Sequence, residues 1–144
     1  MITILGFVSL CSGCKSDIPI FDETRAFAYL VRQCDFGPRN PGSDGYYACL
    51  EYIKTELDQS ADEIILQDFS YQEQRNNNKY ELQNVIARFN PNADFQTVIS
   101  AHWDTRPWAD QDKNQGNKKS PILGANDGAS GVAVLLELAK VLSE

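Results

Sequence analysis

The chain's single histidine stands in the segment Ala101-His102-Trp103-Asp104. The segment follows the most strand-like stretch of the sequence, T-V-I-S-A, and ligands of open α/β sheets bind at that end of a strand. Asp104 is close enough in sequence to orient the imidazole, as a carboxylate does beside a metal-bound histidine. Alone the pattern is weak, because a lone histidine at a strand end is more often structural. A site built from several histidines is excluded.

A second carboxylate, Asp127, lies in the small-residue segment G-A-N-D-G-A-S-G at residues 124–131. Capping and the helix dipole favour an aspartate at the start of a helix, which is the plain explanation. Three glycines and two alanines around it exceed what capping requires, and they let the backbone approach another group closely. The segment is therefore expected to bind a metal ion or a substrate.

The elements that must position these residues alternate along the chain. Helical spacing and cap residues predict helices over 21–34, from Ser43 or Asp44 to Leu57, and over 130–142. Strands are expected over 64–71, 84–89 and 97–102. Turn residues at 90–94 predict that the last two strands pair as a hairpin, and 103–121 reads as a long loop. Interleaved helices and strands indicate an α/β fold.

Each expected helix has an apolar face that should enter the core. The predicted core residues are Phe27, Leu30, Val31 and Cys34, then Tyr46, Cys49, Leu50, Ile53 and Leu57, and finally Val132, Leu135, Leu136, Ala139 and Leu142. Glu137 is interpreted as part of the polar face of the last helix and not as a catalytic base.

Composition sets outer bounds on function. The 144 residues suit one domain, and 42% hydrophobic with 23% charged residues is typical of a soluble globular protein. A net charge of −7 without a basic run argues against nucleic acid as a partner.

Residues 1–14 form an apolar run that ends in small residues and is too short to span a bilayer as a helix. Ser12-Gly13 before Cys14 resembles a bacterial lipoprotein cleavage box, and the alternative is a buried N-terminal strand. We expect a leader, export to the periplasm or outer membrane, and a lipid anchor at Cys14. Export would permit a disulfide between Cys34 and Cys49, although two separate thiols are the preferred interpretation.

Two motifs together carry a family resemblance. A-H-W-D-T-R-P-W-A-D from Ala101 and P-I-L-G-A-N-D-G-A-S-G-V-A-V-L-L-E-L-A from Pro121 resemble the zinc aminopeptidase (M28) superfamily. Within it, they are most similar to bacterial glutaminyl-peptide cyclotransferases of the animal type. F-G-P-R-N-P-G-S-D-G-Y-Y-A-C-L-E-Y-I from Phe36 resembles the helix-turn-helix before the sheet of those proteins. The resemblance covers residues 21–144 and implies the N-terminal part of a three-layer α/β/α fold with a mixed β-sheet.

The resemblance also implies zinc and assigns residues to it. Asp127 matches a zinc-ligating aspartate. His102 matches a histidine that binds the second zinc of dizinc aminopeptidases, a position that need not bind metal in single-zinc cyclotransferases. Asp104 matches the active-site aspartate that supports this histidine. The turn 39–43 matches one near the site, to which no catalytic role is assigned.

Peptide or protein N-termini are the implied substrates, with two activities open. A cyclotransferase converts N-terminal glutamine to pyroglutamate and releases ammonia, whereas an aminopeptidase removes the N-terminal residue. The family's catalytic glutamate, a zinc-ligating glutamate and a last zinc-ligating histidine lie beyond the position of Glu144. We therefore expect residues 21–144 to be a C-terminally truncated domain without activity of its own. A third interpretation is a non-catalytic fragment that binds zinc weakly.

Overall fold

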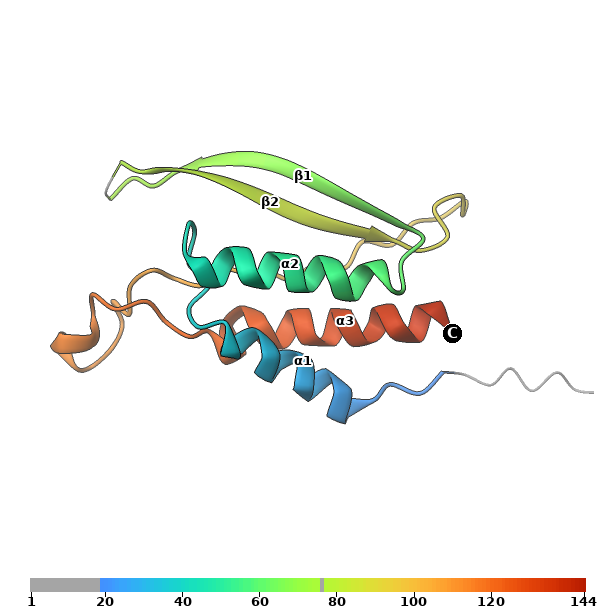
Figure 1. Cartoon of the computed structure of the whole chain (residues 1–144), viewed down its shortest axis with the longest axis horizontal. Helices are drawn as coiled ribbons and strands as arrows, with labels where there is room; N and C mark the ends of the chain where they lie inside the picture. The colour runs from blue at the N-terminus through green and yellow to red at the C-terminus, as the bar shows by residue number, and fades with distance from the viewer. Residues whose placement is uncertain (1–18, 76) are drawn as a thin grey trace, which may run out of the picture.

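The computed structural model describes residues 19–75 and 77–144. In this part of the chain there are three α-helices, α1 (Glu23–Asp35), α2 (Asp44–Asp58) and α3 (Ser130–Ser143), and two strands, β1 (Glu63–Gln72) and β2 (Lys79–Arg88). A short 3₁₀ helix, η1 (Gln115–Asn117), and a kinked segment, η2 (Ala125–Ala129), precede α3. The hairpin of β1 and β2 packs on α2, and α3 packs on both α2 and α1 (Figure 1). Helices beside a small sheet confirm the predicted α/β class.

Helix α2 joins the hairpin to the other helices. Its N-cap is Ser43, whose Oγ accepts a hydrogen bond from the backbone N–H of Tyr46 at 3.1 Å. All five predicted core residues of this helix are buried, namely Tyr46, Cys49, Leu50, Ile53 and Leu57. Three of them form the main core cluster together with residues of α1 and α3. The N-cap residue and the helical spacing of apolar residues were therefore sufficient to predict both the start and the buried face of α2.

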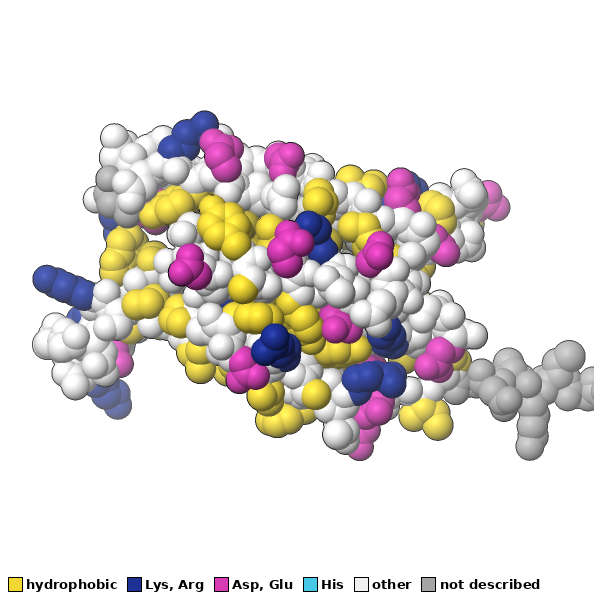
Figure 2. Space-filling view, viewed as in Figure 1, with side chains coloured by type: hydrophobic (Ala, Val, Ile, Leu, Met, Phe, Trp, Pro, Cys, Tyr) yellow, Lys and Arg dark blue, Asp and Glu magenta, His cyan; other side chains and the backbone are white. Residues whose placement is uncertain are grey.

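Helix α1 begins after its predicted N-cap, Asp22, but its predicted core face is only partly confirmed. Leu30 is half-buried against the core and Cys34 is half-buried, whereas the other two predicted residues are exposed. Phe27 is 65% exposed and Val31 is 41% exposed. The buried residues are instead Ala26, Tyr29 and Gln33. The reason is a long-range contact, since Gln33 Nε2 donates to the carbonyl oxygen of Ala129 at 3.1 Å. This bond turns the Gln33 face toward η2 and α3 and leaves Phe27 and Val31 on the outside. Hydrophobic side chains are accordingly visible among charged ones over the helices and hairpin (Figure 2).

In helix α3, the prediction for Glu137 is wrong. Glu137, predicted on the polar face, is fully buried. Arg25 donates to it through Nε at 2.6 Å and through Nη2 at 2.7 Å. The backbone N–H of Asp22 donates to the same carboxylate at 2.9 Å. These bonds compensate the burial of a charge and fix α1 to α3. Of the predicted apolar stripe, Val132, Leu136 and Ala139 are buried, whereas Leu142 is exposed.

The sheet of the described residues consists of β1 and β2, paired antiparallel from Glu63↔Arg88 to Gln72↔Lys79. The predicted hairpin between 84–89 and 97–102 is wrong. β2 starts at Lys79 and pairs with β1 over its whole length, a register that also leads Leu82 onto α2. Residues 97–102 belong to no strand of the described chain.

Cys34 and Cys49 are free thiols. Burial raises the pKa of Cys49 to about 11, so this thiol stays protonated and unreactive at neutral pH. The predicted leader and Cys14 lie outside the described residues. Among the helices that are described, none has the length and apolar character needed to cross a bilayer.

Candidate functional site

A buried arginine connects the segments that carry the predicted site residues. Arg39 is fully buried, and its Nε donates to the carbonyl oxygen of Trp103 at 3.0 Å. Its Nη1 donates to Leu123 O at 3.0 Å and its Nη2 to Gly124 O at 2.9 Å. The backbone N–H of Arg39 donates to Thr105 Oγ1 at 2.8 Å. The loop that carries His102 and the glycine-rich segment are thus held by one side chain.

The remaining contacts of Arg39 reach the end of α1. Its Nη1 also donates to Gln33 O at 3.2 Å and to Gly37 O at 3.4 Å. A guanidinium suits this position because its five N–H groups point in fixed directions within one plane. No catalytic role was predicted for the turn 39–43, and the burial of Arg39 was not expected, because arginine is rarely buried. The one sequence feature that could have indicated this role is the position of the arginine inside a rigid turn of proline and glycine residues.

The glycine-rich segment lies directly against the loop after residue 101. Gly124 has φ +64°, and a Cβ there would lie 2.3 Å from Thr105 Cγ2. Gly128 has φ +108°, and a Cβ there would lie 3.2 Å from His102 Cε1 and 3.1 Å from Asp104 O. The small residues therefore serve close backbone approach, as the sequence predicts.

Asp127 does not cap α3. The N-cap of that helix is Ala129, and no side chain caps it. Asp127 itself has the non-helical angles φ −91° and ψ 90°. The capping explanation of this aspartate is thereby excluded, and its 58% exposed side chain is available for another role.

The three predicted site residues come together. His102 Nε2 lies 3.1 Å from Asp127 Oδ1. On the other side of the ring, Nδ1 lies 3.1 Å from the backbone oxygen of Asp104 and 3.5 Å from its Oδ1. Asp104 thus orients the imidazole mainly through its backbone. When Nδ1–H donates to that oxygen, Nε2 keeps its lone pair on the side of Asp127.

An imidazole nitrogen and a carboxylate oxygen are both typical zinc ligands. Two ligand atoms of a tetrahedral zinc with bonds of about 2.0–2.1 Å lie about 3.3 Å apart. The 3.1 Å between His102 Nε2 and Asp127 Oδ1 fits such an edge. Within the described residues, no group of three His, Cys, Asp or Glu side chains could hold a metal ion. The donor set fits two ligands of a zinc centre.

Comparison with known proteins shows which family the chain resembles. Residues 84–144 match the model of peptidase family M28. This range contains His102, Asp104 and Asp127. The match confirms the predicted resemblance to the zinc aminopeptidase (M28) superfamily.

Individual relatives narrow the resemblance. The glutaminyl cyclase of Bacteroides thetaiotaomicron, solved bound to N-acetylhistamine, is 38% identical with a TM-score of 0.83 over 88% of this chain and 43% of that one. A Zn-dependent exopeptidase from Parabacteroides distasonis is 35% identical with a TM-score of 0.82 over 85% of this chain and 42% of that one. The glutaminyl-peptide cyclotransferase of Gloydius blomhoffii is 30% identical over 72% of this chain and 27% of that protein. The chain therefore shares the fold of these proteins and spans less than half of their length.

Proposed function

We propose that this chain supplies part of the active site of a glutaminyl-peptide cyclotransferase-like zinc enzyme. Such an enzyme acts on peptide or protein N-termini and converts N-terminal glutamine to pyroglutamate. The observation that carries the proposal is the 3.1 Å approach of His102 Nε2 to Asp127 Oδ1. It occurs in a chain that is similar to solved glutaminyl cyclases.

In this reaction the α-amine of the glutamine attacks the carbonyl carbon of its own side chain. The ring C–N bond forms, the bond to the amide nitrogen breaks, and one proton passes from the amine to the departing ammonia. A zinc ion, when bound, acts as a Lewis acid on such a carbonyl oxygen. Asp127 and His102 are the residues that would hold it.

The other residues of the site position these two. Asp104 fixes the tautomer and the direction of the His102 ring, and it is the carboxylate we propose as an active-site residue. Arg39 holds the segments of His102 and Asp127 in register. Gly128 lets Asp127 approach the imidazole closely.

The second candidate function is that of an aminopeptidase, which removes the N-terminal residue of a peptide. A bound metal would there supply the activation of water. The observation in its favour is the similarity to the Parabacteroides distasonis exopeptidase. A third candidate is a fragment without catalysis that binds zinc weakly. It is supported by the two donors of the described residues, because catalytic zinc sites use three protein ligands. We accordingly propose that the 144-residue chain alone does not catalyse cyclisation.

The test has two stages. Zinc affinity is first measured by calorimetry on the chain itself, where Asp127→Asn should abolish binding and the exposed Asp94→Asn should leave it unchanged. The chain is then joined to the remaining part of the Tannerella forsythia glutaminyl cyclase, to which it is 38% identical. Ammonia release from a glutaminyl peptide supports the cyclase, and release of free glutamine supports the aminopeptidase. Turnover by the chain alone would contradict the expected inactivity.

We further propose that the chain is exported and carries a lipid at Cys14. The support is the cleavage-box-like sequence Ser12-Gly13 before this cysteine. Labelled fatty acid should be incorporated in a bacterial host and lost in Cys14→Ser, whereas incorporation that survives this change would contradict the anchor.

A further inference from the structure

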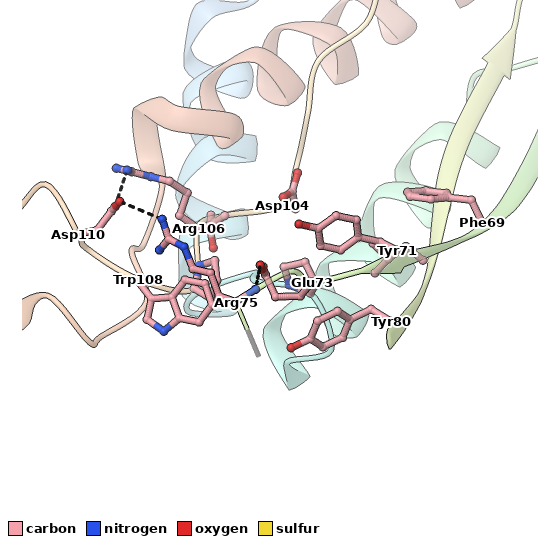
Figure 3. A pocket seen from close by; sticks show the side chains of 13 residues that line it. Phe69, Tyr71, Glu73, Arg75, Tyr80, Asp104, Arg106, Trp108 and Asp110 are labelled. Carbon is pink, nitrogen blue, oxygen red and sulfur yellow. Dashed lines mark hydrogen bonds and ion pairs between the residues drawn. The ribbon is translucent and has the colours of Figure 1, made fainter. Parts of the chain in front are cut away.

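A cavity of about 500 Å³ opens beside the candidate site. Its walls come from the end of β1, the start of β2 and the loop that follows His102 (Figure 3). Asp104 lines this cavity and also bonds the His102 ring through its backbone oxygen. The cavity and the candidate site therefore share Asp104, and the volume of the cavity suits a side chain or a small ligand.

Aromatic side chains form much of the cavity wall. Phe69 is 41% exposed and Tyr71 is 42% exposed, although both lie on a strand that packs against a helix. Tyr80 from β2 and Trp108 from the loop complete the aromatic lining (Figure 3). Exposed aromatic rings that share one concave surface are typical of binding sites.

The two arginines of the cavity already have partners. Arg106 Nη1 lies 2.9 Å from Asp110 Oδ1, and Arg75 Nη2 lies 3.7 Å from Asp110 Oδ2. The Arg75 guanidinium also lies 5.1 Å from the centre of the Trp108 ring. Both guanidinium groups thus share one carboxylate at the same end of the cavity (Figure 3).

Two carboxylates also line the cavity. Glu73 lies next to Arg75, and Asp104 lies beside the Tyr71 ring (Figure 3). The Glu73 carboxylate accepts a hydrogen bond from the backbone N–H of Arg75 at 3.1 Å, and it forms no ion pair with a cationic side chain among residues 19–75 and 77–144. Carboxylates flanked by tyrosine rings favour a cation that carries an apolar stem, through ion pairing and cation–π attraction.

We propose that this cavity binds a lysine or arginine side chain of a peptide, located within the three residues after the peptide's N-terminal residue. Three extended residues span about 10 Å, a reach that suits a cavity sharing Asp104 with the candidate site. The inference rests on the proposed function, which places the peptide's N-terminus at His102 and Asp127.

The test measures calorimetric affinities of the full chain for amidated tetrapeptides that begin with glutamine. In each peptide, one position among the second, third and fourth carries lysine, norleucine or glutamate. The other two of these positions carry alanine. At one position, lysine should bind at least about tenfold more tightly than norleucine, and glutamate should bind most weakly. Norleucine has the apolar stem without the charge, so equal affinity for lysine and norleucine at all three positions would overturn the proposal.

Two variants locate the preference. Glu73→Gln keeps an acceptor for the Arg75 N–H and should remove most of the lysine preference while norleucine binding stays unchanged. Glu81→Gln, on β2 beside Lys79, is the matched control and should keep the preference. A lysine preference that survives Glu73→Gln in a variant with an unchanged circular dichroism spectrum would overturn the assignment.

Replacing the N-terminal glutamine by alanine separates this inference from the proposed function. Measured on the chain joined to the remaining part of the Tannerella forsythia glutaminyl cyclase, a lysine preference that persists while glutamine itself contributes nothing supports the cavity and contradicts the cyclase. A preference for glutamine without any for lysine supports the cyclase and overturns the cavity assignment.

Discussion

Nη2 of Arg39 lies 2.9 Å from the carbonyl oxygen of Gly124, the first residue of the segment that carries Asp127. Nε of the same guanidinium donates to Trp103 O, between His102 and Asp104. The Arg39 guanidinium therefore sets the distance between the segment of His102 and the segment of Asp127. These two candidate zinc ligands lie 3.1 Å apart.

Arg39→Lys should damage both stability and zinc binding. An ammonium group lacks the planar fork and cannot reach five carbonyl oxygens, so we expect a loss of about 2–4 kcal/mol of unfolding free energy. Urea denaturation measures this loss, and calorimetry should show weaker zinc binding. The control is Arg32→Lys on the exposed face of α1, where a loss of less than about 0.5 kcal/mol is expected. Unchanged zinc affinity in Arg39→Lys would contradict the positioning role.

Gly128→Ala should push Asp127 away from His102. The φ of +108° disfavours alanine, and its Cβ would also press on His102 Cε1 and Asp104 O. Gly37→Ala is a matched control, because Gly37 also has a positive φ of +80° but nothing lies within 4 Å of its Cβ position. Alanine in the left-handed helical region costs about 1–2 kcal/mol. Gly128, with φ +108° and ψ −61°, lies outside that region, so its backbone strain adds to the effect of the contacts. A larger loss in urea unfolding for Gly128→Ala than for Gly37→Ala is the expected result, and equal losses would refute close approach.

The Arg25–Glu137 pair predicts how stability depends on pH. The bonds from Arg25 hold the pKa of Glu137 below its ordinary value of about 4.3. Its stabilisation is thus complete above that ordinary value and is lost as the pH falls toward the lower pKa of the folded state. Glu137→Gln should lower the urea midpoint at pH 7. It should also make the free energy of unfolding fall less steeply with decreasing pH below a pH of about 4.3.

The matched control for this pH profile is Glu51→Gln on α2, where the exposed carboxylate bonds Lys54. We expect it to leave the acid limb of the profile unchanged. An equally steep decline in Glu137→Gln and the wild type would show that other groups dominate acid unfolding.

Residues 95–99 should drive self-association of the 144-residue chain. Phe95 is 93%, Val98 89% and Ile99 60% exposed. Extended apolar backbone outside a ladder is a template for pairing with another chain. Val98→Lys with Ile99→Lys should shift sedimentation toward the monomer. Val31→Lys, which changes an exposed apolar residue of α1, should not, and a monomeric wild type would contradict the prediction.

Signals within a few residues of each other predicted the fold best. Ser43 and the spacing from Tyr46 to Leu57 were sufficient for α2. The meeting of His102 and Asp127 could be expected from the family resemblance of their two motifs, although the strand predicted before His102 is absent from the described residues. The face of α1 depends on Gln33 reaching Ala129 O, 96 residues away, and no local pattern contains that bond. The buried states of Arg39 and Glu137 were missed for the same reason, since their partners are distant in sequence.

The Arg39 contacts differ from the Arg25–Glu137 pair in what they respond to. The acceptors of the Arg39 guanidinium in the described chain are backbone carbonyl oxygens, which do not change charge with pH. Buried dipoles are also little screened by salt. While α1 and α3 can loosen as acid protonates Glu137, the spacing of His102 and Asp127 should stay constant wherever the chain is folded. The hydrogen bonds that space the two segments therefore depend little on pH and ionic strength.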